Sequence, residues 1–186
     1  MVTMQVLLYQ PEDNMEIKIP FYNIVNMFLT GLVLIGGCFL IFFDSLMELI
    51  ENETFTAFFA KISAGPEVVL TVCAFATAYE LGLIVNRLGS VLLEPLLKVT
   101  KLIPFDEDYK KFNVRKKAYP IMNTLSREYA LSRTGVSLFL ILTALALYHA
   151  KFAYVTVFFV ISIVYCLSCR KHASKIVSLM SGDEEK

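Results

Sequence analysis

The sequence predicts an all-α protein, a bundle of four transmembrane helices with cytosolic helical extensions of the second and third spans. Of its 186 residues, 56% are hydrophobic. The charged residues collect between long uncharged runs, which is typical of a chain solvated by lipid. Several of these runs approach the 20 or so helical residues that a bilayer core of about 30 Å requires. We therefore expect one integral membrane domain, 1–186.

Four runs are expected to span the membrane, at about 20–43, 66–88, 134–150 and 152–169. The first contains no charge. The second begins with Gly65-Pro66-Glu67, where proline suits the first helical turn and glutamate favours the positive end of the helix dipole. The third and fourth are short and separated by the single charge of Lys151, so they should form a tight antiparallel hairpin.

The cytosolic connection, 88–133, is expected to be partly helical. Pro120 suits a helix start and no breaker follows before Gly135, so the third span should begin about two or three turns below the membrane. Apolar residues also continue the second span as far as Pro95, which should kink or end that helix. The polar stretch 101–117 is expected to be a loop or small cap.

Basic residues set the orientation, because positively charged loops stay on the cytoplasmic side. With both termini inside, all but two of the 17 lysines and arginines are cytosolic, the exceptions being Lys61 and Lys151. The connection between the first two spans is acidic. We expect a multi-pass protein of the inner (plasma) membrane. The net charge of zero predicts no general attraction to nucleic acid, so any such contact should be indirect.

Glu80 and Arg87 lie inside the second apolar run. Measured from Glu67 at the outer boundary, Glu80 is about 20 Å into the helix and Arg87 about 30 Å. Arg87 can therefore reach headgroups, and a boundary anchor explains it. A charge well inside a bilayer costs on the order of 3 kcal/mol, so Glu80 should face protein or water, be protonated, or have a cationic partner.

Other polar residues are expected at the same membrane level. We predict an intramembrane cluster centred on Glu80, in the cytosolic leaflet, with Arg133 or Arg87 as its cationic partner. Two interpretations stay open: an ion or proton relay or switch, and a buried pair that only fixes helix register. The two asparagines of the first span could also mark its start at headgroup level. The predicted cluster comprises Glu80, Arg87, Asn86, Arg133, Asn23 and Asn26.

Small residues recur every four positions on another side of the second span. Such a stripe lets a neighbouring helix approach closely. The second span is therefore expected to be central and packed on two sides. The predicted packing residues are Ala74, Ala78, Gly82 and Ser90, with Asn86 in the same stripe.

The segment "YKKFNVRKK", 109–117, clusters basic and aromatic residues. It could contact anionic headgroups, an acidic protein partner or nucleic acid, or could serve only to set topology. We predict that it docks a cytosolic partner or lipid. The predicted docking residues are Lys110, Lys111, Arg115, Lys116, Lys117 and Arg127.

Catalytic and metal chemistry are not indicated. "CLSC", Cys166 to Cys169, has C-x-x-C spacing, but a zinc site needs four ligands and no second such pair exists. Ordinary membrane-helix cysteines explain it better than a metal or redox site. Common hydrolase and nucleotide-binding motifs are absent, and the two histidines should lie at opposite membrane faces. We expect no catalytic residues, no metal, no cofactor and no enzymatic activity.

The stretch "YELGLIVNRLGSVLLEP", with its Asn86-Arg87, Gly89-Ser90 and Glu94-Pro95 pattern, precedes a basic connection and a terminal hairpin. In these features the chain resembles small four-span bacterial inner-membrane proteins associated with anti-phage defence, nearest the membrane subunit of Kiwa-type systems. The resemblance implies an oligomeric membrane platform that detects phage-induced disturbance and holds a cytosolic effector.

The leading functional hypothesis is therefore a non-enzymatic sensor or scaffold subunit. Its expected partners are membrane lipids, further copies of the chain and a cytosolic protein. The alternative is a conducting protein, such as a small ion channel, pore-forming effector or transporter, with Glu80 in the pathway.

Overall fold

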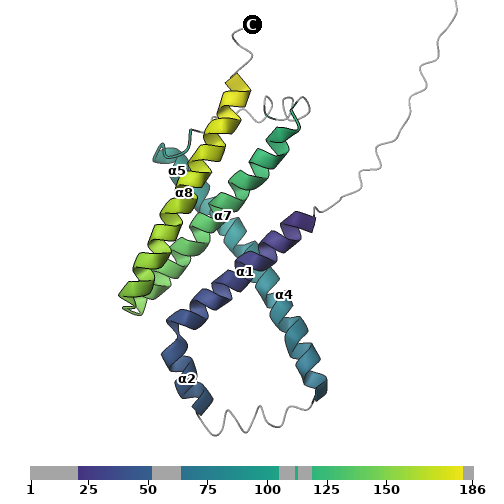
Figure 1. Ribbon diagram of the computed structural model, residues 1–186, viewed down its shortest axis with the longest axis vertical. Helices are drawn as coiled ribbons and strands as arrows, with labels where there is room; N and C mark the ends of the chain where they lie inside the picture. Colours follow the sequence, from purple (N-terminus) through teal and green to yellow (C-terminus); the bar gives the residue numbers. More distant parts are fainter. Residues whose placement is uncertain (1–20, 52–63, 105–111, 113–118, 182–186) are drawn as a thin grey trace, which may run out of the picture.

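The computed structural model describes residues 21–51, 64–104, 112 and 119–181, and these form helices and no strand (Figure 1). Four of the helical segments are long and apolar enough to cross a membrane: Phe21–Ile41, Glu67–Val99, Ile121–Tyr148 and Phe152–Met180. The predicted all-α, four-span bundle is confirmed. The elements in order are α1 (Phe21–Ile41), α2 (Phe43–Glu51), α4 (Ala64–Leu88), the π-helix η1 (Gly89–Leu93), α5 (Glu94–Val99), α7 (Ile121–Tyr148) and α8 (Phe152–Ser181).

Helices α7 and α8 lie side by side and antiparallel, while α1 crosses α4 (Figure 1). The end of the molecule where α1 begins, α5 ends, α7 begins and α8 ends is called the basic end. The opposite end, at the turn between α7 and α8, is called the hairpin end. The four membrane-spanning segments therefore alternate in direction between these two ends, as a four-span chain requires.

A short turn joins α7 to α8, as the lone charge of Lys151 predicted. Ala150 adopts a left-handed conformation with φ 53°, and the backbone N–H of Lys151 donates to the carbonyl of Ala146 at 2.9 Å. The Lys151 ammonium group pairs with the carboxylate of Asp44, in the first turn of α2. This contact ties α2 to the hairpin end.

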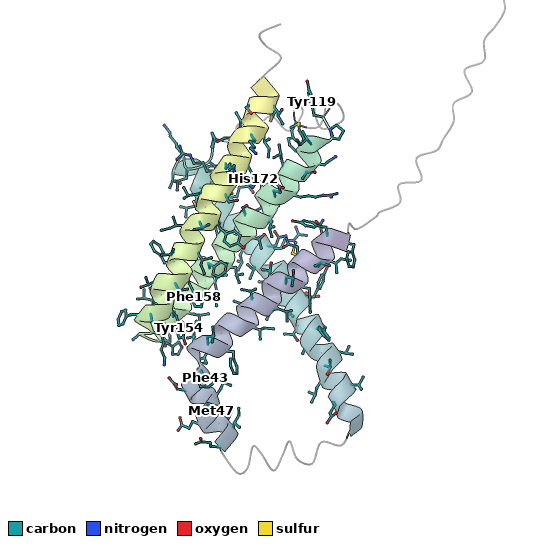
Figure 2. The ribbon with its side chains drawn as sticks, viewed as in Figure 1. Phe43, Met47, Tyr119, Tyr154, Phe158 and His172 are labelled. Atoms are coloured by element: carbon teal, nitrogen blue, oxygen red, sulfur yellow. The ribbon has the colours of Figure 1, made fainter. Side chains whose placement is uncertain are left out.

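The acidic connection after the first span begins with a helix that was not predicted. Helix α2 carries Asp44, Glu48 and Glu51, and none of its residues is buried. Phe43 and Met47 lie along its exposed surface (Figure 2). The short α2 therefore continues the chain beyond the end of α1 at Ile41 without joining the core.

Pro95 does not end the second span. The chain widens into the π-helix η1, in which the N–H of Glu94 donates to the carbonyl of Gly89, and Pro95 then occupies the first turn of α5. Proline lacks an N–H and its ring clashes with the carbonyl four residues back, and a π-turn relieves this conflict while the helix continues. The predicted local disturbance is present, but the helix runs on to Val99.

The helical extensions are longer than the sequence suggested. Helix α7 begins at Ile121, directly after Pro120, as predicted. Helix α8 continues past Cys169, where the fourth span was expected to end, and reaches Ser181. The extension of the fourth span was therefore missed.

The extensions at the basic end pack around one apolar core. We call residues 93–103, 121–136 and 169–176, which contribute this core, the helical platform. A second core lies toward the hairpin end and includes Val85, Leu142 and Phe158. The platform core consists of Leu93, Leu97, Ile103, Met122, Leu125, Tyr129, Val136, Cys169, Ala173 and Ile176.

Candidate functional site: a polar pocket between α1, α4 and α7

A cavity of about 200 Å³ opens where the start of α1, the end of α4 and the first half of α7 meet. Its lining holds two arginines and three asparagines, and no carboxylate among the described residues. Three helices far apart in the sequence contribute to it. The lining residues are Tyr22, Asn23, Asn26, Met27, Asn86, Ser126, Arg127, Ala130 and Arg133.

The close crossing of α1 and α4 builds one wall of this pocket. A Cβ placed on Gly31 would lie 1.6 Å from the carbonyl oxygen of Ala78, and a Cβ on Gly82 would lie 1.7 Å from that of Met27. Only glycine permits this approach of two backbones. One helical turn further toward the basic end, the same crossing brings Asn23 of α1 and Asn86 of α4 to the pocket.

Asn86 is held from behind by α7. The hydroxyl of Thr134, which is buried, lies 2.8 Å from Oδ1 of Asn86 and 2.9 Å from the carbonyl oxygen of Ala130, and these two acceptors share its single proton. Because Oδ1 faces Thr134, the side-chain NH₂ group of Asn86 points the other way and keeps both of its donors for a ligand. The bond therefore fixes which end of the amide is free to meet a ligand.

Arg133 forms the inner, charged part of the pocket. Its guanidinium donates to the carboxylate of Glu94, and Lys98 lies 3.4 Å from the other oxygen of that carboxylate. The guanidinium carbon also lies 5.9 Å from the ring centroid of Tyr129, within cation–π range. The Nε of Arg133 is buried and finds no hydrogen-bond partner among the described residues.

Arg127 lies at the exposed side of the pocket. It forms no ion pair with any residue in the described ranges, and its side chain is exposed. Arg127 and Arg133 both line the pocket, and the carboxylate paired with Arg133, that of Glu94, is not part of the lining, so the described lining carries positive charge. An anion is the ligand that this field favours.

Glu80, expected at the centre of the polar cluster, does not line the pocket. It is exposed, as is Arg87, and neither has an ion-pair partner within the part of the chain that the structure describes. The acid next to Arg133 is Glu94. The expectation that the cluster centres on Glu80, with Arg133 or Arg87 as its partner, is therefore wrong for the isolated chain.

The π-helix explains this difference. Glu80, Arg87 and Glu94 share a face in a regular helix, since they recur every seven residues. An extra residue in the turn at Gly89–Leu93 rotates the helix after this turn by roughly 100° relative to a regular helix. This rotation separates Glu94, which meets α7, from the two charges before it.

Only part of the predicted small-residue stripe packs against another helix. Ala78 and Gly82 contact α1, as expected, and Ser90 is half-buried. Ala74 is exposed, together with all of 67–77, so the first half of α4 is not packed on two sides as predicted. Gly89 was missed: a Cβ there would lie 2.7 Å from Oγ of Ser137 on α7.

Several residues of the site were not found from the sequence. Tyr22 and Ser126 line the pocket. Glu94 pairs with Arg133 and Lys98, and Thr134 bonds to Asn86, outside the pocket lining. The charge of Arg133 marked this level of α7, but nothing marked Thr134, because neighbouring residues in a helix point to different sides. Gly31 and Gly37 in an otherwise apolar span also marked the face of α1 that meets other helices.

The other predicted features are placed only in part. Lys110, Lys111, Arg115, Lys116 and Lys117 lie outside the described residues, whereas Arg127 is at the pocket. Cys166 and Cys169 are free, and the described residues hold no group of three or more potential metal-ligating His, Cys, Asp or Glu side chains. His172, labelled in Figure 2, belongs to α8 and lies in the platform. Its Nδ1 is 3.1 Å from Oε2 of Glu128.

The chain was compared with protein-family models, curated proteins and solved structures, and nothing matches it in any of the three.

Proposed function

We propose that this protein is a non-enzymatic, oligomeric membrane scaffold that holds a cytosolic protein on its helical platform. The observation that carries the proposal is the platform core. Leu97 of α5, Met122 and Leu125 of α7, and Ile176 of α8 are buried against one another beyond the predicted spans. A chain that only crossed the bilayer would need no such folded extension on one side.

The basic segment gives this platform a docking surface. Residues 109–117 lie within the connection from α5, which ends at Val99, to α7, which begins at Ile121, and both of these helices belong to the platform. Five lysines and arginines within 109–117 favour an acidic protein surface. With the basic end in the cytosol, as the distribution of lysine and arginine favours, the platform lies at the inner face of the plasma membrane.

Self-association is supported by the exposure of Glu80. An uncovered carboxylate within a membrane span is costly, by about 3 kcal/mol on insertion scales. Residues 67–77 of the same helix are exposed all round, with Val68, Val72 and Phe75 each more than half exposed. A second copy packed along α4, whose residues 67–77 are left exposed, would shield this carboxylate from the lipid.

The resemblance to Kiwa-type membrane subunits favours a role for this scaffold in bacterial anti-phage defence. A scaffold that detects membrane disturbance and releases or activates a bound effector suits anti-phage defence. Genes beside the one that encodes this chain provide an inexpensive check, since a defence role expects an adjacent effector or nuclease gene.

The docking surface is tested by affinity purification of the full-length chain from native membranes. Charge reversal of Lys110, Lys111, Arg115, Lys116 and Lys117 should abolish capture of the cytosolic partner. The matched control is Lys61→Glu, on the predicted outer side, which should leave capture unchanged. A partner that stays bound after the fivefold reversal would refute this docking surface.

Self-association is tested by counting subunits in lipid nanodiscs. Glu80→Leu and Glu80→Gln should change the oligomer distribution, whereas Glu67→Gln, at the start of the same helix, should not. A chain that is monomeric in nanodiscs at every protein concentration would refute the oligomeric scaffold.

Conduction is the second candidate, because an exposed Glu80 could line a pathway between copies. Ion flux into liposomes containing the purified protein, abolished by Glu80→Gln and retained in Glu67→Gln, would favour a channel over a scaffold. The scaffold proposal expects no flux above that of empty liposomes.

A further inference from the structure

We infer that the pocket between α1, α4 and α7 binds the phosphate group of an anionic membrane-lipid headgroup. The inference uses the pocket and the membrane-spanning fold, and it does not depend on self-association or on a cytosolic partner. A free phosphate ion offers the same oxygen acceptors, so the two sources of phosphate must be separated by experiment.

The chemistry of the lining suits a phosphate. Arg127 and Arg133 present guanidinium groups, which match phosphate oxygens with paired N–H donors. Asn23, Asn26 and Asn86 add amide donors, and Tyr22 and Ser126 add hydroxyls. Because none of the described residues that line the cavity is a carboxylate, this part of the lining does not repel an anion.

Arg133 has a hydrogen-bond donor available for such a ligand. Its side chain is 12% exposed, it already donates to Glu94, and its Nε donor is buried without a partner among the described residues. A buried donor without a partner is destabilising. A phosphate oxygen near Arg133 would offset this deficit, directly or through a water.

The level of the pocket in the fold favours a lipid source. Tyr22 and Asn23 belong to the first turn of an apolar, 21-residue span, where headgroups meet the hydrocarbon. Arg127 precedes Arg133 by six residues on α7, which places it about 9 Å further from the membrane centre. The two arginines therefore bracket the headgroup region.

The size of the cavity and its neighbours agree with a headgroup. Its volume of about 200 Å³ is smaller than the roughly 300–1,000 Å³ of pockets that enclose drug-sized ligands. Phe21 and Ile24, beside the pocket on α1, are 78% and 41% exposed. Acyl chains could lie along these side chains while the phosphate sits among the polar groups.

The positive end of the α1 dipole adds to the attraction. The first-turn N–H groups of a helix carry a partial positive charge, which favours anions. Tyr22 and Asn23 bring this end to the cavity, and the arginines of α7 face it from the other side. The helix terminus supports the site, while the arginines and asparagines define it.

The test uses the full chain reconstituted in vesicles of phosphatidylcholine alone, or of equal parts phosphatidylcholine and phosphatidylglycerol. Native mass spectrometry then counts the lipids that stay bound. We expect selective retention of phosphatidylglycerol, reduced about tenfold or more in Arg127→Gln, because a charge-assisted hydrogen bond is lost. Arg170→Gln, an exposed arginine of α8 outside the pocket, is the matched control and should retain phosphatidylglycerol fully.

A second variant distinguishes loss of lipid binding from loss of folding. Asn26→Asp preserves the side-chain shape and puts a carboxylate in the pocket, so it should expel the phosphate while the melting temperature stays near that of the unchanged protein. Retention of phosphatidylglycerol that is unchanged in both Arg127→Gln and Asn26→Asp would overturn the inference.

Competition separates the two sources of phosphate. Millimolar inorganic phosphate or glycerol phosphate should leave retention of phosphatidylglycerol unchanged if the site recognises a lipid. Displacement of the lipid by inorganic phosphate at equal concentration would overturn the lipid assignment in favour of a site for free phosphate.

Discussion

The guanidinium of Arg133 on α7 is ion-paired with the carboxylate of Glu94 on α5, and the two side chains are only 12% and 14% exposed. This pair lies between the polar pocket and the platform core. It therefore links the residues that face the proposed lipid with the helices that would hold a cytosolic partner.

Removing either member of this pair should have unequal effects. Glu94→Leu leaves the buried guanidinium of Arg133 without its carboxylate, so we expect a loss of about 2–3 kcal/mol in the free energy of unfolding. Arg133→Met leaves Glu94 with Lys98, 3.4 Å away, and should cost about 1 kcal/mol less. Unfolding in mixed micelles measures both, and equal losses would contradict the shared-carboxylate arrangement.

The crossing of α1 and α4 should be intolerant of a single methyl group. In Gly31→Ala the new Cβ would meet the backbone of Ala78, so the helices must separate, at a cost of about 2–3 kcal/mol. Gly36→Ala is the control, since nothing lies within 4 Å of its Cβ, and it should change stability by less than about 1 kcal/mol. Helix propensity alone favours alanine in both variants, so similar changes in stability for the two would contradict a close backbone contact at Gly31.

Lys151 provides a pH-dependent contact at the hairpin end. The hydrogen bond and negative charge of Asp44 raise the pKa of Lys151 above its ordinary value of 10.5. Since the folded pKa is raised, the contact should stabilise the fold below about pH 10.5 and be lost as the pH rises through the folded pKa. NMR titration of isotopically methylated lysine measures this pKa directly.

Asp44→Asn should return the pKa of Lys151 toward 10.5, because the partner charge is gone. Glu48→Gln, one turn along α2, should leave the pKa unchanged. If the pKa of Lys151 does not change in Asp44→Asn, the ion pair between Lys151 and Asp44 does not form in solution.

Leu142 is fully buried and packs on Gly37, where a Cβ would lie 2.6 Å from one of its methyl groups. Leu142→Ala should cost about 2 kcal/mol, mostly through lost packing, because lipid supplies no hydrophobic driving force between helices. Leu147→Ala, on an exposed position of the same helix, should be nearly neutral.

Coupling between the two positions gives a stricter test. Gly37→Ala should be destabilising alone, since its methyl group meets Leu142, but should recover part of the loss in the Leu142→Ala background, where it fills the space. Additive effects of the two substitutions would contradict direct packing of Leu142 on Gly37.

The four spans, the tight hairpin and the start of α7 after Pro120 were predictable from the sequence. Each depends on the length of an apolar run, a single charge or a proline, and these act within a few residues of their own position. The grouping of Asn23, Asn26 and Asn86 with Arg133 also followed, because alternating spans with fixed lengths bring these residues to one membrane level.

The tertiary structure alone decided which charges meet. The partner of Arg133 is Glu94 rather than Glu80 because the π-helix at Gly89–Leu93 changes the rotation of the chain about its axis, and a heptad count assumes regular turns. The joining of α5, α7 and α8 in one platform was equally hidden. Membrane level depends on distance along a helix, which a sequence records, whereas contact depends on rotation and crossing, which only packing against other helices determines.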